Sequence, residues 1–462
     1  MLVYLTMKKL LLLLLPASLL ASAVTAQAPE LDSMIHRANR LGVFNGNVLV
    51  ADHHQVIYKT AIGIADASGK TPLTTDHRFH IGSIAKEFNA VAIMMLKAQG
   101  KLKLEDKVSL YLPELPAWAE KISILNLLQY TSGLPDLNWK TAKSDADIMQ
   151  DLKDLKQLNF EPGTNYAYNN NNVFLQRRII EKITGIAFNE FVKRYLLEPA
   201  GMNHSIIDPT EKDELMAISF TDDRQSRSLF SPISGWTAVT LDDFYKWATS
   251  INTFKFLSPA DTRTILYPAG PNKQSGLGGG EMKGDSIILH IHDGSSLSYN
   301  ALLVDYPGKG RTVILLTNNR QDNLYDFNNA IQAILDGRPY QQPKKSVGSL
   351  FKGKLDSLSG KQLLSLYQQL KKKYSDQYNF DNEAALNMIG YDYLGRKKVD
   401  DAIVIFEYNT RLFPQSGNVF DSLGEAYYRK GDKQKALLNY KRSLELDPSN
   451  VTAKQVIEEL GK

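Results

Sequence analysis

The spacing of apolar and polar residues predicts a sheet that is interrupted by a long helical middle. Residues 46–66 alternate as in two paired strands, with a polar turn at residues 52–54. From Phe88 to Leu96 the apolar spacing becomes helical, and Gly100 marks the end of that helix. Further strands are predicted at residues 287–292, 299–304 and 312–316, and a further helix near residues 323–335. This order favours an α+β fold in which an antiparallel sheet is flanked by helices and a helical cluster.

A second pattern begins after residues 337–345, which have the composition of a linker. Beyond them the chain repeats itself at a spacing of 34 residues. The residues Gly390, Tyr393, Ala402, Phe406, Leu412 and Pro414 recur as Gly424, Tyr427, Ala436, Tyr440, Leu446 and Pro448. This period resembles tetratricopeptide repeats, so we expect a linker and helical segment at 339–380 and an all-α repeat domain at 381–462. A helical bundle with a coincidental register is the alternative.

The N-terminal residues are typical of a targeting segment. Lys8 and Lys9 precede an apolar run over residues 10–21, and small side chains follow at Val24 and Ala26. We therefore expect a signal peptide at residues 1–26, cleaved to leave a periplasmic or secreted protein without a stable membrane span. An uncleaved anchor is the alternative.

Composition narrows the chemistry. The 462 residues include 43% hydrophobic and 23% charged side chains, which is ordinary for globular domains, and the net charge is only +4. The longest basic run singled out is Lys371–Lys373, so no nucleic-acid partner is expected. The chain has no cysteine, which excludes disulfides, a thiol nucleophile and thiolate metal sites.

The first candidate for chemistry is a Ser-x-x-Lys sequence. Ser83 and Lys86 lie three residues apart at the start of the helix that is predicted to run to Leu96, so they share one face. Serine needs a neighbour that takes its proton, and Lys86 is placed to be that neighbour. On its own the pair is weak evidence, since exposed Ser and Lys residues on a helix are common.

The second candidate is Tyr168 with Asn170, which follow a proline-glycine turn at Pro162 and Gly163. A phenol held near a lysine ammonium is expected to have a lowered pKa and to act as a general base. The Asn170 amide could contact a substrate or the lysine. The alternative is a polar loop rich in asparagine.

The third candidate is the segment from His290 to Ser295 on a predicted strand. Gly294 would let a substrate backbone approach the strand edge, and the Ser295 N–H could serve with that of Ser83 as an oxyanion donor. His290 and His292 point to one face of the sheet, so a metal pair is the alternative, although no third ligand is evident.

Taken together, the three motifs resemble those of class C β-lactamases and related penicillin-recognising hydrolases. The resemblance covers about residues 30–336, and it includes the flanking sequences 122–135, 198–202 and 316–318. It implies a serine hydrolase domain at 27–338, with Ser83 as the acylated nucleophile, Lys86 as its partner, Tyr168 as the general base and Asn170 as a substrate or lysine contact. No cofactor or metal is implied.

The sequence departs from that family in the third motif. His292-Asp293-Gly294 stands where the family usually has Lys-Thr-Gly or Lys-Ser-Gly. Because histidine is mostly neutral at pH 7, it attracts a substrate carboxylate less than lysine does, which makes efficient β-lactam hydrolysis doubtful. We expect cleavage of an ester or amide in a small molecule or peptide, for which the cell wall is one candidate source. The alternatives are an idle receptor for cell-wall peptides or β-lactams, and a scaffold whose repeats bind a protein or peptide.

Overall fold

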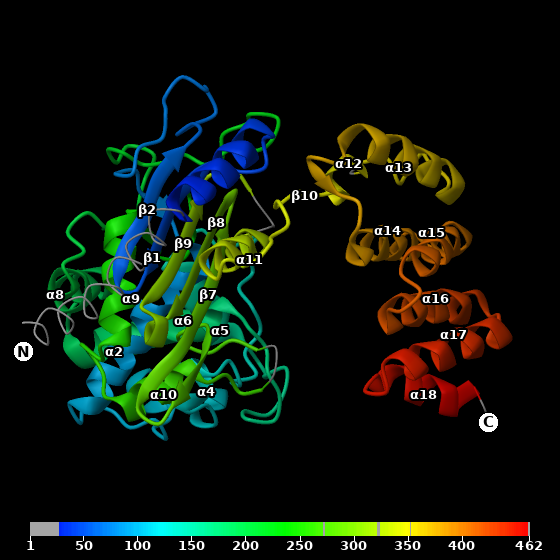
Figure 1. Ribbon diagram of the computed structural model, residues 1–462. Coiled ribbons are helices and arrows are strands. Elements are labelled where there is room, and N and C mark those ends of the chain that lie inside the picture. The colour runs from blue at the N-terminus through cyan, green and yellow to red at the C-terminus, as the bar shows by residue number, and fades with distance from the viewer. Residues whose placement is uncertain (1–26, 271–272, 321–323, 352, 461–462) are drawn as a thin grey trace, which may run out of the picture. The chain divides into compact units, whose positions relative to one another are not determined.

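The chain forms two compact units, which we describe in a computed structural model (Figure 1). The structure describes residues 27–270, 273–320, 324–351 and 353–460, so the predicted signal peptide lies outside the described residues. The first unit ends at Pro343 and the second begins at Lys344, inside the predicted linker. Within the described residues, no helix has the length and apolar character needed to cross a membrane.

The first unit is built on a six-stranded sheet with the strand order β2-β1-β9-β8-β7-β6, in which every neighbouring pair is antiparallel. The strands are β1 (Gly46–Asp52), β2 (Gln55–Ile62), β6 (Gly279–Lys283), β7 (Ser286–Ser296), β8 (Tyr299–Tyr306) and β9 (Arg311–Thr317). Strands from the beginning and the end of the unit therefore pair with each other. This confirms the predicted antiparallel sheet.

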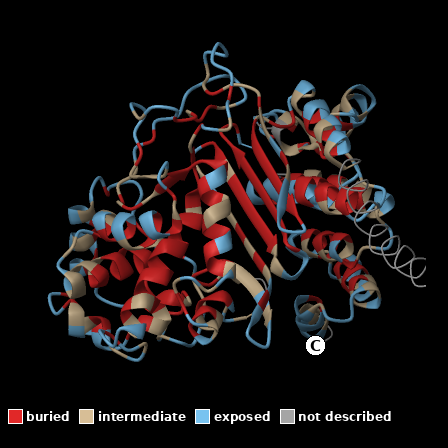
Figure 2. Cartoon of the chain, turned by 60° about the vertical axis from the view of Figure 1, so that its left-hand side comes forward, coloured by how far each residue is buried: buried red, intermediate tan, exposed pale blue. Residues whose placement is uncertain are grey.

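The central strands are apolar at nearly every position because both faces of the sheet are covered (Figure 2). In β1, Leu49 and Ala51 face one buried core, whereas Val48 and Val50 face the other. The helix over residues 27–40 and α11 (Leu324–Leu335) supply the second core. The helices α2 (Lys86–Ala98), α6 (Asn170–Thr184) and α9 (Leu241–Asn252) belong to the first core.

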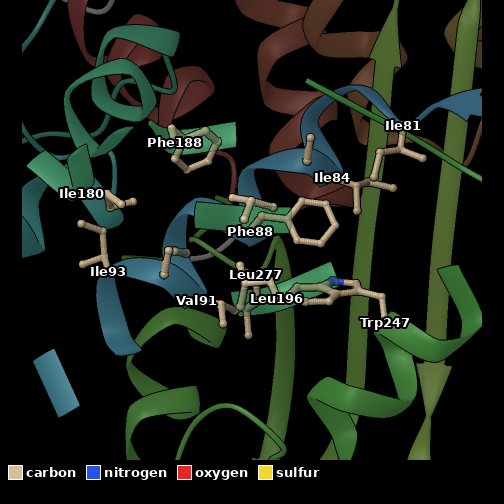
Figure 3. Close-up of a cluster of buried hydrophobic side chains, with 14 of the residues drawn as sticks. Ile81, Ile84, Phe88, Val91, Ile93, Ile180, Phe188, Leu196, Trp247 and Leu277 are labelled. Carbon is tan, nitrogen blue, oxygen red and sulfur yellow. The ribbon is translucent and has the colours of Figure 1, made fainter. Parts of the chain in front are cut away.

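Helix α2 is the central helix of the first core (Figure 3). Its residues from Lys86 to Met94 are all buried, which is unusual for a helix that also carries charged side chains. Phe88 packs on Trp247 of α9 with ring centroids 4.4 Å apart. The helix that begins beside Ser83 is therefore buried in the first core, where it packs on α6 and touches α9 through Phe88.

A smaller three-stranded sheet leads the chain into this helix. It consists of β3 (Phe79–His80), β4 (Ile206–Ile207) and β5 (Thr237–Val239), in the order β3-β5-β4. The backbone N–H of Ile81, which follows β3, donates to the carbonyl of Thr237 at 3.1 Å. The residues just before Ser83 are fixed by these bonds.

The second unit consists mainly of paired helices, as the repeat predicted. They are α12 (Gly348–Phe351), α13 (Gly360–Tyr374), α14 (Glu383–Gly395), α15 (Val399–Leu412), α16 (Gly417–Lys430), α17 (Lys433–Leu446) and α18 (Val451–Leu460). A Cβ placed on Gly390 would lie 2.4 Å from the Phe406 ring, and one on Gly424 would lie 3.1 Å from the Tyr440 ring. The same close helix contact thus occurs twice, 34 residues apart. A short parallel pair, β10 (Lys345–Ser346) with β11 (Tyr378–Asn379), was not predicted.

Candidate active site

Ser83 lies in a helical turn that opens directly into α2. The turn is the 3-10 helix η1 (Gly82–Ala85), and Lys86 is the first residue of α2. Because the two residues are three apart, their side chains share one face of the turn. The Lys86 Nζ donates to the Ser83 Oγ at 2.9 Å. The structure thus brings the predicted nucleophile into contact with an amine.

Lys86 is almost completely buried, with only 3% of its surface exposed. Burial, followed by the positive charge of Arg177, lowers the pKa of Lys86 to about 7, although Asp136 opposes the shift. The Nζ also lies 5.1 Å from the ring centroid of Trp236. At neutral pH a large fraction of Lys86 is therefore an uncharged amine that can accept a proton.

Tyr168 lies on the other side of the same amine. Its hydroxyl accepts a hydrogen bond from the Lys86 Nζ at 2.8 Å, and its ring centroid is 4.6 Å from that of Tyr130. The N–H of Ala167 donates to the Tyr130 carbonyl at 2.9 Å, which fixes the loop that carries the phenol. Ser83, Lys86 and Tyr168 form one continuous chain of hydrogen bonds.

The expected lowering of the Tyr168 pKa is wrong in direction. Burial raises the pKa of the Tyr168 phenol above its usual range, and the hydrogen bond with Ser83 only partly opposes that effect. The desolvation of a phenolate outweighs the nearby amine, because the amine itself loses its charge when it is buried. These directions favour Lys86 over Tyr168 as the group that accepts a proton, and the catalytic roles of the two residues stay predictions.

Asn170 is the first residue of α6 and lies beside Asp136. Its backbone N–H donates to the Asp136 Oδ1 at 2.9 Å. Within the part of the chain that the structure describes, its buried side-chain oxygen Oδ1 has no hydrogen-bond partner. The contact of Asn170 with a substrate stays a prediction.

Gly294 and Ser295 lie on β7 against the turn that holds Ser83. A Cβ placed on Gly294 would lie 2.0 Å from the Ile81 carbonyl oxygen and 3.0 Å from the Ser83 nitrogen. A Cβ on Gly82 would lie 2.5 Å from the Ser295 nitrogen. The strand and the turn therefore meet backbone to backbone. The close approach of the turn is a structural reason for glycine at this position, and the approach of a substrate backbone to the strand edge stays a prediction.

His292 is a buried residue of strand β7. Only 2% of its surface is exposed, and its Nδ1 lies 2.7 Å from the Oε1 of Glu87. His290 shares the same oxygen, at 3.0 Å from its Nε2. The structure thus places His292 in a buried cluster with Glu87 and His290. Its role in substrate binding stays a prediction. No group of three or more His, Cys, Asp or Glu residues suited to hold a metal ion occurs among the described residues.

Sequence reasoning missed several residues that shape the site. Glu87 was a detectable candidate, since it directly follows Lys86 and two alternating histidines on a buried strand need a polar partner. Trp236 and Arg177 gave no signal, because they come from segments whose proximity to Lys86 depends on the folded chain. Tyr130 was part of a recognised flanking segment, but its contact with Tyr168 was not anticipated.

Comparisons with known proteins identify the family of the first unit. The family described as Beta-lactamase matches residues 31–337, and a tetratricopeptide repeat matches residues 418–450. A penicillin-binding protein of Bacillus subtilis (strain 168) is 28% identical over 338 residues, which cover 65% of this chain and 74% of that protein. A putative penicillin-binding protein of the same strain, PbpX, is 26% identical over 314 residues, covering 63% of this chain and 75% of the relative.

Solved structures show the same fold in the first unit. A penicillin binding protein from Bacillus halodurans superposes with a TM-score of 0.57 at 22% identity and covers 65% of this chain and 98% of its own. A class C beta-lactamase superposes with a TM-score of 0.56 at 20% identity and covers 68% of this chain and 96% of its own. The predicted mixed fold and the family resemblance are confirmed.

Proposed function

The chain belongs to the β-lactamase family, and from that premise we propose that it is an exported serine hydrolase that cleaves an ester or amide through an acyl-enzyme on Ser83. One observation supports the proposal above all others. The Ser83 hydroxyl, the Lys86 amine and the Tyr168 phenol are joined by hydrogen bonds of 2.9 and 2.8 Å in a partly buried site. A merely structural Ser-Lys pair would not require a buried lysine with a pKa near 7.

The proposed acylation begins with neutral Lys86. Its amine takes the proton of the Ser83 hydroxyl, and the oxygen attacks the substrate carbonyl carbon. The resulting ammonium gives a proton to the Tyr168 oxygen while the phenol gives its own proton to the leaving nitrogen or oxygen. The bond to the leaving group breaks, the acyl group remains on Ser83, and Lys86 is neutral again.

Deacylation uses the same path in reverse. Water attacks the acyl carbon, its proton passes to Lys86 through Tyr168, and Lys86 returns a proton to the Ser83 oxygen. In both steps the negative oxygen of the tetrahedral intermediate is stabilised by the backbone N–H groups of Ser83 and Ser295. Removal of one oxyanion donor from a serine protease of another fold costs about 2.7–4 kcal/mol, which sets the scale expected here.

The third motif bears on the substrate. His292 is bonded to Glu87, and the neighbouring Asp293 accepts a hydrogen bond from the Tyr325 hydroxyl at 2.9 Å. The motif therefore offers no fixed lysine cation to a substrate carboxylate, and it adds a carboxylate of its own. We propose that neutral acyl esters and amides are better substrates than β-lactams, whose carboxylate would meet that charge.

The test compares a substrate panel with a serine variant. A p-nitrophenyl ester, a D-amino-acid amide, a D-Ala-D-Ala peptide and nitrocefin are offered to the protein, and a fluorophosphonate probe reports acylation directly. Ser83→Ala is expected to abolish turnover and labelling. Ser286→Ala, which changes an exposed serine at the start of β7, is the matched control and should behave as the wild type. Equal labelling of Ser83→Ala and the wild type would overturn the proposal.

A second role is proposed for the second unit. Paired helices with a tetratricopeptide match are typical of domains that bind a protein or peptide, so we propose that this unit recruits a partner. The experiment is capture from an extract by residues 344–462 and by the full chain, with the first unit as the negative control. If the first unit captures the same protein, the binding site does not lie in the repeats.

A further inference from the structure

We propose that Glu87 is a positioning residue whose buried carboxylate fixes strand β7, and with it the Ser295 N–H, against the helix that carries Ser83 and Lys86. The inference rests on the proposed function, because it concerns how that same site is held together. Glu87 itself would not contact the substrate.

The carboxylate of Glu87 joins three elements of the first unit. Glu87 lies on α2 directly after Lys86, and none of its surface is exposed. Its Oε1 faces the Nδ1 of His292 at 2.7 Å and the Nε2 of His290 at 3.0 Å, and both histidines belong to β7. Its Oε2 accepts a hydrogen bond from the indole N–H of Trp247 on α9 at 2.6 Å.

Strand β7 depends on this attachment at its C-terminal end. Its pairing with β6 runs from Lys283 opposite Ser286 to Gly279 opposite Ile291, so the segment 292–296 continues beyond the last β6 partner. On the other side, β8 pairs along the strand as far as Ser296. Among the residues that the structure describes, a sheet ladder holds only the β8 edge of that segment. The bond between His292 and Glu87 supplies an attachment of this segment to α2, and the bond from His290 holds the strand just before it.

The segment 292–296 can shift very little without a steric clash. The strand and η1 approach so closely that neither Gly82 nor Gly294 has room for a Cβ. An oxyanion donor works when it lies about 2.7–3.1 Å from the charged oxygen, and a donor that is misplaced loses most of its effect. A shift of β7 by a few tenths of an ångström would therefore change catalysis before it unfolded the protein.

The cluster is better suited to positioning than to stability alone. Burial by itself raises the pKa of Glu87, but the charge of His290 and the hydrogen bonds from both histidines outweigh it and lower the pKa to about 2. The carboxylate is therefore ionised and acts only as an acceptor, so the facing nitrogens of His290 and His292 carry protons. Buried charges of this kind cost desolvation and often stabilise a fold no better than apolar packing does. Such hydrogen bonds instead fix the orientation of the side chains that they join, because each bond holds a particular atom in place.

The test is Glu87→Gln, which keeps the shape of the side chain but replaces one acceptor oxygen by a donor. We expect kcat for a p-nitrophenyl ester to fall about ten-fold or more, with KM changed by less than about two-fold. A second readout is specific to the oxyanion: the ratio of rates for an ester and for the thionoester of the same acyl group. Because sulfur is a weak hydrogen-bond acceptor, the wild type should prefer the ester, and the preference should shrink in Glu87→Gln.

The matched control is Asp243→Asn on α9. Asp243 is also fully buried and accepts bonds from the His204 N–H, the Ser205 hydroxyl and Lys246, but it has no bond to β7. This variant should lose stability and keep both the rate and the ester preference. If Glu87→Gln does not fold, His290→Leu, which has no polar group to bond to Glu87 and so removes one attachment from β7, should show the same shrinkage to a smaller extent.

The outcomes separate the two proposals. Turnover that survives Ser83→Ala overturns the proposed function. Turnover that depends on Ser83, together with a wild-type ester preference in the folded Glu87→Gln or His290→Leu protein, overturns the positioning role of Glu87 alone. A reduced preference in these variants and an unchanged preference in Asp243→Asn supports it.

Discussion

At the scale of single residues, the ionisation of Lys86 determines how the site responds to pH. Lys86 acts as a base only when it is neutral, and burial and Arg177 lower its pKa to about 7. The value of kcat/KM is therefore expected to rise with pH through the neutral range and to level off above it. The measurement is a pH profile of ester turnover between pH 5 and pH 9, a range that brackets about two units on either side of that pKa.

Arg177 gives a sharper form of the same prediction. Its guanidinium is fully buried, lies 5.6 Å from the Trp236 ring, and donates to the Gly235 carbonyl at 3.2 Å. Burial lowers the pKa of Arg177, and the negative charges of Asp208, Asp145 and Glu181 partly oppose that effect. Arg177→Met removes a positive charge that disfavours the Lys86 ammonium, so the pKa of Lys86 rises and the acid limb of the profile moves to higher pH, by about half a unit or more.

Arg178 provides the control for Arg177→Met. Arg178 is the next residue of α6, and its guanidinium is already paired with Asp145 at 3.2 Å and with Glu181 at 3.1 Å. Arg178→Met should leave the acid limb in place even if it lowers stability. An acid limb that does not move in Arg177→Met would show that the buried guanidinium does not control the amine.

At the scale of elements, the crossing of β7 and η1 leaves no space for an added side-chain atom. A Cβ on Gly294 would lie 2.0 Å from the Ile81 carbonyl oxygen, and backbone atoms cannot move aside as a flexible side chain can. Gly294→Ala is expected to cost about 1–3 kcal/mol of unfolding free energy and to lower kcat about 100-fold or more, because the Ser295 donor is displaced. Denaturant unfolding and ester turnover measure the two effects.

Gly279→Ala is the matched control in the neighbouring strand. Gly279 lies on β6 opposite Ile291, and a Cβ placed there would meet no atom within 4 Å. This variant should keep both stability and turnover close to those of the wild type. Equal behaviour of the two alanine variants would mean that the crossing is not tight.

Elements and motifs could be predicted from the sequence, whereas contacts between distant elements could not. Local spacing was enough to find the helix that begins at Lys86 and the strand that carries His292. The bond between Glu87 and His292 spans 205 positions of the chain, so no local pattern reports it. The same reason explains the error about Tyr168, because its pKa is determined by burial that only the folded molecule shows.

At the scale of the whole molecule, the two units have separate hydrophobic cores. The core of the second unit is formed by buried residues from Val347 to Ala453, and the last buried residue in the cores of the first unit is Leu335. Catalysis and partner binding are therefore expected to be separable by truncation. The position of the cut matters, because the segment that follows α11 packs back onto the first unit.

A cut after Pro343 should leave an active enzyme. Such a protein keeps Tyr340, which packs on the core beneath α11, and Gln342, whose side chain donates to the Met34 carbonyl at 3.1 Å. We expect its kcat/KM for a p-nitrophenyl ester to stay within about two-fold of the full chain, since no residue of the site is removed. A cut after Gly337 removes both contacts and should lower Tm by about 2–4 °C per kcal/mol of stability lost. Loss of turnover after the Pro343 cut, in a protein that is still folded by circular dichroism, would show that the second unit acts in catalysis itself.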